Sequence, residues 1–261
     1  MTKAIDAAIL LNKNYQEQSV FLPENLLREA RRQKYIEDCS VPSVCILDPD
    51  GDLVDYLLKN GKAKMNECWS CYHSKLYSVL LDDRQVGIIP CVVGSSYAVL
   101  VAEQLFVSGC ELLISITSAG IITEPKTAKR FALITEAVRD EGTSYHYLPK
   151  EKPSALSKEL IEHLPENDLW FRAKSWTTDA PYRETTSAII EMKAQGITCV
   201  EMEAAALYAF AETKNRNVIC FAHLTNTMAQ QEGDFEKGEY FGSLESLALI
   251  RSTLNTLNNK N

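Results

Sequence analysis

The chain has 261 residues, with 27 basic and 35 acidic side chains, so its formal net charge at pH 7 is −8. This length suits one large α/β domain or two small ones, and an apolar fraction of 46% is enough for a sizeable core. The acidic balance argues against a nucleic-acid partner, because non-specific binding needs cations to neutralise phosphates. It does not exclude a small anionic ligand, which a few local donors can bind.

The N-terminal segment, residues 1–18, has an apolar patch too short for the hydrophobic region of a signal peptide. No segment is apolar enough to predict a transmembrane helix. We therefore expect a cytoplasmic protein with no membrane partner, whose eight cysteines are reduced. Cys68 and Cys71 form a lone CxxC without a second ligand pair at zinc spacing, so two ordinary thiols are favoured over a metal or redox site.

Predicted helices and strands alternate along almost the whole chain. In chain order, the patterns predict a helix at 24–38, a strand within 41–52, a helix at 53–60, strands at 75–81 and 85–93, a helix at 94–109, strands at 110–120 and 130–142, a proline-rich excursion with a helix within 147–168, a strand and polar loop at 173–185, a helix at 186–195, a strand at 197–203 that continues into a helix, a strand at 217–226 and a helix at 243–257. Short apolar strands of this kind favour an α/β layered fold with a sheet covered on both faces. We expect one domain over residues 1–261, with residues 1–40 as a helical N-terminal extension.

Ligands of such sheets bind at the carboxyl ends of the strands. Gly94 and Ser95 lie between a predicted strand and helix, where free N–H groups can bind an anion, but taken alone these residues favour a plain helix cap. Thr117 and Ser118 end another strand, and their hydroxyls suit a sugar, an oxyanion or a tight turn. Asn226 ends the last strand and suits a base, a leaving group or a turn.

Glu201 and Glu203 are two positions apart, with one residue between them, so on a strand both would face the same side. Glutamate in the first turn of a helix is also stabilised by the helix dipole. The flanking residues are apolar, however, which predicts burial, and a buried carboxylate needs partners. The two adjacent hydroxyls of a ribose would supply such partners.

Together these segments resemble the nucleoside phosphorylase family, which includes uridine phosphorylase, hexameric purine nucleoside phosphorylase and the methylthioadenosine/adenosylhomocysteine nucleosidases. The most specific segment is VEMEAAALYA at 200–209, and the others are GSSYAVLVAEQL at 94–105, LLISITSAG at 112–120, AVRDEGTSYHY at 137–147 and TTDAPYRET at 177–185. The resemblance covers residues 41–258. It implies a three-layer fold with a central mixed sheet, a nucleoside substrate, no metal, no cofactor, and a homo-oligomer, either a dimer or a hexamer.

The resemblance also implies roles for single residues. Glu203 and Asn226 are the expected catalytic residues, Glu203 on the ribose diol and Asn226 at the leaving base. Residues expected at the ribose and base are Glu201, Met202, Glu203, Asp179 and Tyr182, with Tyr182 replacing the family's usual stacking phenylalanine, which is Pro181 here. Residues expected at the phosphate, or at another nucleophile, are Gly94, Ser95, Ser115, Thr117 and Ser118.

The chain departs from the family at the nucleophile. The positions of the phosphorylases' phosphate-binding arginines are occupied by Ser115, Leu53 and Tyr72. The nucleosidases share the Ser-Ala-Gly turn of residues 118–120, which favours hydrolysis. Their water-activating glutamate, however, also falls at Leu53, and their base-protonating aspartate falls at Asn226.

Three functions follow from this comparison. Phosphorolysis of uridine or another nucleoside to free base and ribose 1-phosphate, with inorganic phosphate as co-substrate, ranks first. Hydrolysis by water ranks second, and a catalytically weak nucleoside-binding or storage role ranks third. Other residues could replace the missing ones: Asp50, Asp52 or Asp55 as a base for water, and Arg130, Arg139 or Arg183 as a cation for phosphate.

Overall fold

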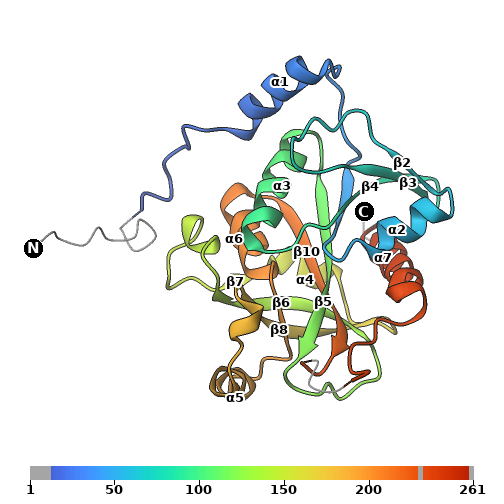
Figure 1. Cartoon of the computed structure of the whole chain (residues 1–261). Helices are drawn as coiled ribbons and strands as arrows, with labels where there is room; N and C mark the ends of the chain where they lie inside the picture. The colour runs from blue at the N-terminus through green and yellow to red at the C-terminus, as the bar shows by residue number, and fades with distance from the viewer. Residues whose placement is uncertain (1–12, 229–231, 259–261) are drawn as a thin grey trace, which may run out of the picture.

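The computed structural model describes residues 13–228 and 232–258 (Figure 1). Ten strands form one sheet: β1 (Val44–Asp48), β2 (Ala63–Met65), β3 (Tyr77–Leu81), β4 (Arg84–Pro90), β5 (Leu112–Ile121), β6 (Phe131–Asp140), β7 (Ser154–Ala155), β8 (Trp170–Thr178), β9 (Cys199–Glu201) and β10 (Asn217–Asn226). The helices are α1 (Pro23–Lys34), α2 (Asp52–Lys59), α3 (Ser95–Val107), α4 (Lys158–His163), α5 (Thr186–Ala194), α6 (Ala204–Lys214) and α7 (Ser243–Asn258), with 3-10 turns η2 (Ser144–His146), η3 (Pro181–Arg183) and η4 (Glu239–Gly242).

The sheet is mixed, as predicted. β1 runs parallel to β4 and β5, β5 runs parallel to β10, and β8 runs parallel to β6 and β9. The β4–β3–β2 edge, β6 with β10, and β5 with β9 are antiparallel. Since β5 pairs with both β10 and β9, the strands β5, β10, β6, β8 and β9 close on themselves, which the sequence did not indicate.

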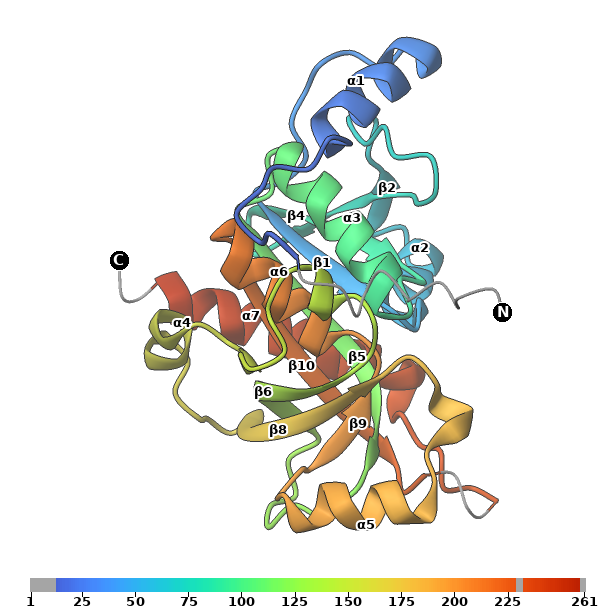
Figure 2. The same cartoon turned by 90° about the vertical axis from the view of Figure 1, so that its left-hand side faces the viewer.

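Helices cover the sheet on both sides, which confirms the predicted α/β fold. α3 and α6 lie on one side of it and α2 and α7 on the other (Figure 1). α3 packs on α6 through Phe106 and Phe210, whose ring centroids are 5.7 Å apart. β1 is buried along its whole length because both of its faces are covered. α5 lies beside β8 and β9, at the opposite end of the molecule from α1 (Figure 2).

The site depends on an interruption in the pairing of β5. β1 pairs with β5 as far as Ser115, and β9 begins to pair at Gly120. Between these points β10 pairs with one edge of β5, while the other edge has no strand partner among the residues described. Thr117 and Ser118 lie in this unpaired stretch, so the ends of β1 and β9 both reach them.

The N-terminal helix α1 is shorter than predicted and packs through its apolar side. α1 begins with Pro23 in its first turn, where a missing N–H costs nothing, and buries Leu27 and Ala30. It ends at Lys34, four residues before the predicted end, because Tyr35 adopts a left-handed conformation with φ of 56°.

Cys39, which follows α1, forms a disulfide with Cys68, so the prediction that all cysteines are reduced is wrong. Lys34 Nζ donates to the carbonyl oxygens of Ser70 (2.9 Å) and Cys71 (2.6 Å), which holds the two segments side by side. Cys71 is free and buried, so the two cysteines of the CxxC are neither paired with each other nor two ordinary thiols.

Other differences from the prediction are local. The sequence patterns did not predict the short strands β2 and β7. They also placed the end of β9 at residue 203, whereas β9 ends at Glu201. Glu203 is the N-cap of α6, so Glu201 and Glu203 do not share a strand face as expected. None of the helices described is long and apolar enough to span a bilayer.

Candidate functional site

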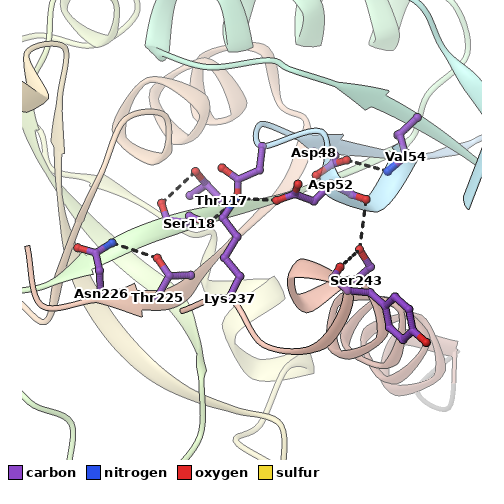
Figure 3. Close-up of polar contacts among 11 residues, drawn as sticks. Asp48, Asp52, Val54, Thr117, Ser118, Thr225, Asn226, Lys237 and Ser243 are labelled. Carbon is purple, nitrogen blue, oxygen red and sulfur yellow. Dashed lines mark hydrogen bonds and ion pairs between the residues drawn. The ribbon is translucent and has the colours of Figure 1, made fainter. Parts of the chain in front are cut away.

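The carboxyl ends of β1, β5, β9 and β10 meet at the unpaired stretch of β5. Two groups of side chains gather there. The first is the Glu201–Glu203 segment between β9 and α6, which contacts the Gly94 loop. The second is the acidic cluster, which we define as Asp48, Asp50 and Asp52. The ammonium of Lys237 contacts this cluster at Asp50 and Asp52 (Figure 3).

Glu201 uses both of its carboxylate oxygens inside the protein. Oε1 accepts from the hydroxyls of Ser175 (3.0 Å) and Thr177, and Oε2 accepts from the backbone N–H groups of Glu203 and Ala204, both at 2.7 Å. The last two donors are at the start of α6, where N–H groups lack partners within the helix. Glu201 therefore anchors α6 to β8, and its oxygens are not free to bind a substrate.

Glu203 is also buried but is only half satisfied. Its Oε1 accepts from the N–H of Gly94 at 2.7 Å, whereas Oε2 is buried without a hydrogen-bond partner among the residues described. Burial and the charge of Glu201 raise the pKa of Glu203 to about 8, against the hydrogen bond from Gly94. The hydroxyl of Thr117 also lies close enough to lower this pKa, although it donates to the Ser118 carbonyl at 3.3 Å.

The Gly94–Ser95 loop is docked onto this glutamate segment. Gly94 has φ of 90°, which favours glycine and turns its N–H toward Glu203. The Ser95 hydroxyl donates to the carbonyl of Met202 at 2.8 Å. Both groups were expected in the phosphate pocket, but here they hold the sugar-binding candidates in place instead of facing an anion.

The acidic cluster follows the end of β1. Asp48 is buried, and its carboxylate accepts from the N–H of Val54 at 3.0 Å, in the first turn of α2. Burial raises the pKa of Asp48 to about 7, and the neighbouring charges of Asp50 and Asp52 act in the same direction, against the hydrogen bond from Val54. Near neutral pH the Asp48 carboxyl is therefore close to half protonated.

Asp50 connects this cluster to β5. Its carboxylate accepts from the hydroxyl of Ser118 and is 3.0 Å from Lys237 Nζ, which also contacts Asp52 at 2.6 Å. Figure 3 shows Lys237 between Ser118 and Asp52. The burial of Lys237 acts to lower its pKa, but the carboxylates of Asp52 and Asp50 outweigh that effect and raise it, so the ammonium stays charged.

A small cavity of about 20 Å³ lies between the acidic cluster and β10, large enough for a single water molecule. The His223 ring faces it, stacks on Phe131 with centroids 4.7 Å apart, and has no partner for Nε2 among the described residues. Burial and the charge of Arg130 lower the pKa of His223 to about 4, so the ring is neutral near pH 7. Residues that line the cavity include Asp48, Asp50, Asp52, Thr117, Ser118, His223 and Ser243.

The expected base-binding residues are less closely gathered. Asn226 pairs with Gly120 across β10 and β5, its amide N–H donates to Thr225 at 3.1 Å, and its oxygen accepts from Met228 N–H at 2.9 Å. Asp179 is exposed and accepts from the N–H of Gly142. Tyr182 is 100% exposed, so its ring stacks on nothing in this structure.

None of the replacement cations suggested by the sequence, Arg130, Arg139 and Arg183, lines the cavity. Arg139 donates to Ser144 and to the carbonyls of Leu148, Pro149 and Lys152, so it organises the loop after β6. Arg130 is exposed at the start of β6. Ser115 and Leu53, at the family's arginine positions, are both buried.

Sequence reasoning missed three residues of this site: Asp48, His223 and Lys237. Asp48 carried a signal, because a carboxylate that ends a buried apolar run needs partners. Lys237 carried none, since its contact with Asp52 spans 185 residues of sequence. Within the described residues, no three or more His, Cys, Asp or Glu side chains are grouped so as to hold a metal ion.

Comparisons with known proteins agree with this architecture. The structure resembles uridine phosphorylase from Vibrio fischeri complexed with 6-hydroxy-1-naphthoic acid (TM-score 0.70, 18% identity, 87% of this chain and 99% of that one). It also resembles purine nucleoside phosphorylase from Toxoplasma gondii in complex with immucillin-H (TM-score 0.67, 16% identity, 85% and 92%).

Two curated sequences are similar over part of their length. An uncharacterized protein of Acanthamoeba polyphaga mimivirus is 28% identical over 141 residues, 54% of this chain and 56% of that protein. A guanosine phosphorylase of Halorubrum lacusprofundi is 25% identical over 146 residues, 54% and 60%. The chain thus spans less than two thirds of these relatives. The family model of the phosphorylase superfamily, in contrast, matches residues 43–253, and the chain belongs to that superfamily.

Proposed function

We propose that this protein cleaves the N-glycosidic bond of a nucleoside and that water is the nucleophile. The observation that carries the proposal is the position of Asp50. Its carboxylate lies beside a water-sized cavity, hydrogen-bonded to Ser118 at the turn of β5. A carboxylate in that place can accept a proton from an attacking water molecule.

The charge of the acidic cluster favours water over phosphate. Asp50 and Asp52 together carry two negative charges, and Lys237, which contacts both, supplies one positive charge. Asp48 adds a further partial negative charge near neutral pH, because its pKa is about 7. A phosphate anion entering this cluster would meet net repulsion, whereas a water molecule meets hydrogen-bond acceptors.

The remaining residues have complementary roles in this proposal. Glu203 accepts hydrogen bonds from the ribose hydroxyls, for which Oε2 is the available oxygen. The ribose becomes cation-like as its bond to the base breaks, and the carboxylate of Asp50 stabilises that charge. Asn226 can donate a hydrogen bond to the leaving base after giving up its contact with Thr225, but it cannot transfer a proton.

Phosphorolysis is the second candidate. The relatives include enzymes named guanosine, uridine and purine nucleoside phosphorylase, which favours phosphate as the co-substrate. Arg130 also lies near enough to the cavity for its charge to lower the pKa of His223. In either case we propose a homo-oligomer, as the resemblance implies, which sedimentation of the purified protein would test.

A panel of purine and pyrimidine nucleosides, incubated with and without inorganic phosphate, tests the proposal. We expect equal rates in both buffers, with free base and free ribose as products. Strict dependence on phosphate with formation of ribose 1-phosphate would replace hydrolysis by phosphorolysis. Nucleoside binding without base release would leave a binding protein.

The role of Asp50 is tested by Asp50→Asn. We expect kcat to fall by about 100-fold or more, the usual contribution of a general base, with a small change in KM. Asp168→Asn, at an exposed position before β8, is the matched control and should leave kcat unchanged. An Asp50→Asn variant with wild-type kcat would remove Asp50 from the mechanism.

A further inference from the structure

We propose that Lys237 is a positioning residue of this site, whose ammonium keeps the Asp50 carboxylate ionised and directed toward Ser118. This inference rests on the proposed function, in which Asp50 accepts a proton from water. Lys237 lies outside the segments that carry the family resemblance. In this proposal its ammonium pairs with Asp50 and does not bind a substrate anion.

The contacts of Lys237 support this role. Nζ is 3.0 Å from Asp50 and 2.6 Å from Asp52, and the lysine side chain is 15% exposed while the two aspartates are 29% and 28% exposed. Two carboxylates that share a site without a counter-charge repel each other, which raises the pKa of at least one of them. One ammonium in contact with both carboxylates offsets that repulsion and holds the two side chains together.

The backbone around Lys237 is fixed on both sides. Before it, the N–H of Glu236 donates to the carbonyl of Thr225 at the end of β10 (2.8 Å). After it, the Ser243 hydroxyl at the start of α7 donates to the carbonyls of Asp52 (3.2 Å) and Tyr240 (2.7 Å). Since the segment is held to β10 and α2, the lysine loses little further freedom when it contacts the aspartates.

Other charged and titratable groups face the same place but do not replace this ammonium. Asp48 and the thiol of Cys91 add only negative charge when ionised, and their pKa values are raised by burial and by the aspartates. His223 is neutral near pH 7, because burial lowers its pKa to about 4. Arg130 is exposed, and its charge helps to lower the pKa of His223. Among the described residues, Lys237 is therefore the cation in ion-pair contact with Asp50.

The experiment compares Lys237→Met, Lys237→Arg and Lys152→Met by the pH dependence of nucleoside cleavage. Lys152 is a matched control, a surface lysine paired with Glu212 at 2.9 Å. For Lys237→Met we expect the acid limb of the kcat profile to move up by at least one pH unit, which is about a tenfold loss of kcat on that limb, with KM within twofold. Lys237→Arg should restore the limb, and Lys152→Met should not move it. A folded Lys237→Met protein with an unmoved acid limb would overturn the proposal.

A second measurement does not depend on catalysis. In protein labelled with ¹³C at the aspartate carboxyl carbon, the Asp50 signal, assigned from its loss in Asp50→Asn, is titrated by NMR. We expect its pKa to rise in Lys237→Met and to fall in Asp52→Asn, where the ammonium serves Asp50 alone. If Lys237→Met does not fold, Lys237→Gln takes its place, because the loss of the Asp52 charge lowers the pKa of Asp50 by itself. An unchanged pKa of Asp50 in the Lys237 variant would contradict the proposal. A wild-type protein without nucleoside cleavage would refute the proposed function, while this titration would still test the effect of Lys237 on Asp50.

Discussion

Two glutamates separated by one residue should respond differently to the same substitution. In Glu201→Gln, one oxygen of a saturated carboxylate becomes an NH₂ group. If that group replaces Oε2, it faces the N–H groups of Glu203 and Ala204, and if it replaces Oε1, it loses the bonds from Ser175 and Thr177. In Glu203→Gln, the amide oxygen keeps the bond from Gly94, and the NH₂ group takes the place of an oxygen that has no partner.

The magnitudes follow from these contacts. Two buried donors without acceptors cost about 1–3 kcal/mol each, so Glu201→Gln should lose about 2–6 kcal/mol of the free energy of unfolding. Glu203 has a folded-state pKa of about 8 against an ordinary value of 4.5, so the folded state disfavours its charge. Its contribution to stability is therefore lost as pH rises from 4.5 to 8, by at most about 3 kcal/mol at pH 7. Glu203→Gln removes that pH-dependent penalty, while its buried NH₂ group adds a constant cost of unpaired donors, so its stability relative to wild type should rise between pH 5 and 8.

Urea unfolding of both variants and the wild type, repeated between pH 5 and 8, checks this pair. The stability of Glu203→Gln relative to wild type should rise with pH, while the loss in Glu201→Gln should persist throughout. Glu203→Gln should also bind nucleoside more weakly, because Oε2, the oxygen available to the ribose hydroxyls, is replaced by a donor. A Glu203→Gln protein whose stability relative to wild type does not rise with pH would refute the assignment of Glu203 as a buried carboxylate whose charge the fold disfavours.

Two further predictions concern groups that the sequence did not identify. The double substitution Cys39→Ser, Cys68→Ser removes a disulfide that spans 29 residues, and loop entropy predicts a loss of about 3–4 kcal/mol of unfolding free energy, measured in denaturant against wild type. A thiol count on the unfolded, unreduced wild type checks the disulfide itself. Six reactive thiols would confirm it, and eight would contradict it. His223 has a folded-state pKa of about 4, below its ordinary 6.5, so stability should fall as pH drops from 6.5 to 4, by about 2 kcal/mol at pH 5. Unfolding of wild type and His223→Gln across this range checks the sign, since a gap between the two proteins that does not narrow with acid would contradict it.

The fold could be predicted to a large extent because local patterns specify it. The apolar strand runs around Ile46, Ile114 and Ile219 are buried on a covered sheet, and the alternation with helices indicates the α/β class. What could not be predicted depends on contacts distant in sequence. The closure of β5 onto both β9 and β10, and the disulfide of Cys39, are visible only once the chain is folded.

In the candidate site, too, residues close together in sequence could be predicted and contacts distant in sequence could not. The Glu201–Glu203 segment was recognised because its residues are contiguous, although periodicity assigned Glu203 to a strand instead of a helix cap. The three aspartates are also close in sequence, at alternate positions from 48 to 52, and Asp50 and Asp52 were considered as bases for water. Lys237 was not, because an isolated lysine in a polar loop has no local pattern that distinguishes it from a solvated one.

The interrupted pairing of β5 has an evolutionary consequence. Two different segments approach the unpaired stretch between Ser115 and Gly120, one from β1 and one from β9, and they contact it through Ser118 and Thr117 respectively. Each segment folds with its own helix, α2 or α6, so substitutions in one need not disturb the other. A lineage can thus exchange the loop after β1, which carries the proposed base Asp50, while it inherits the segment that carries Glu203 unchanged.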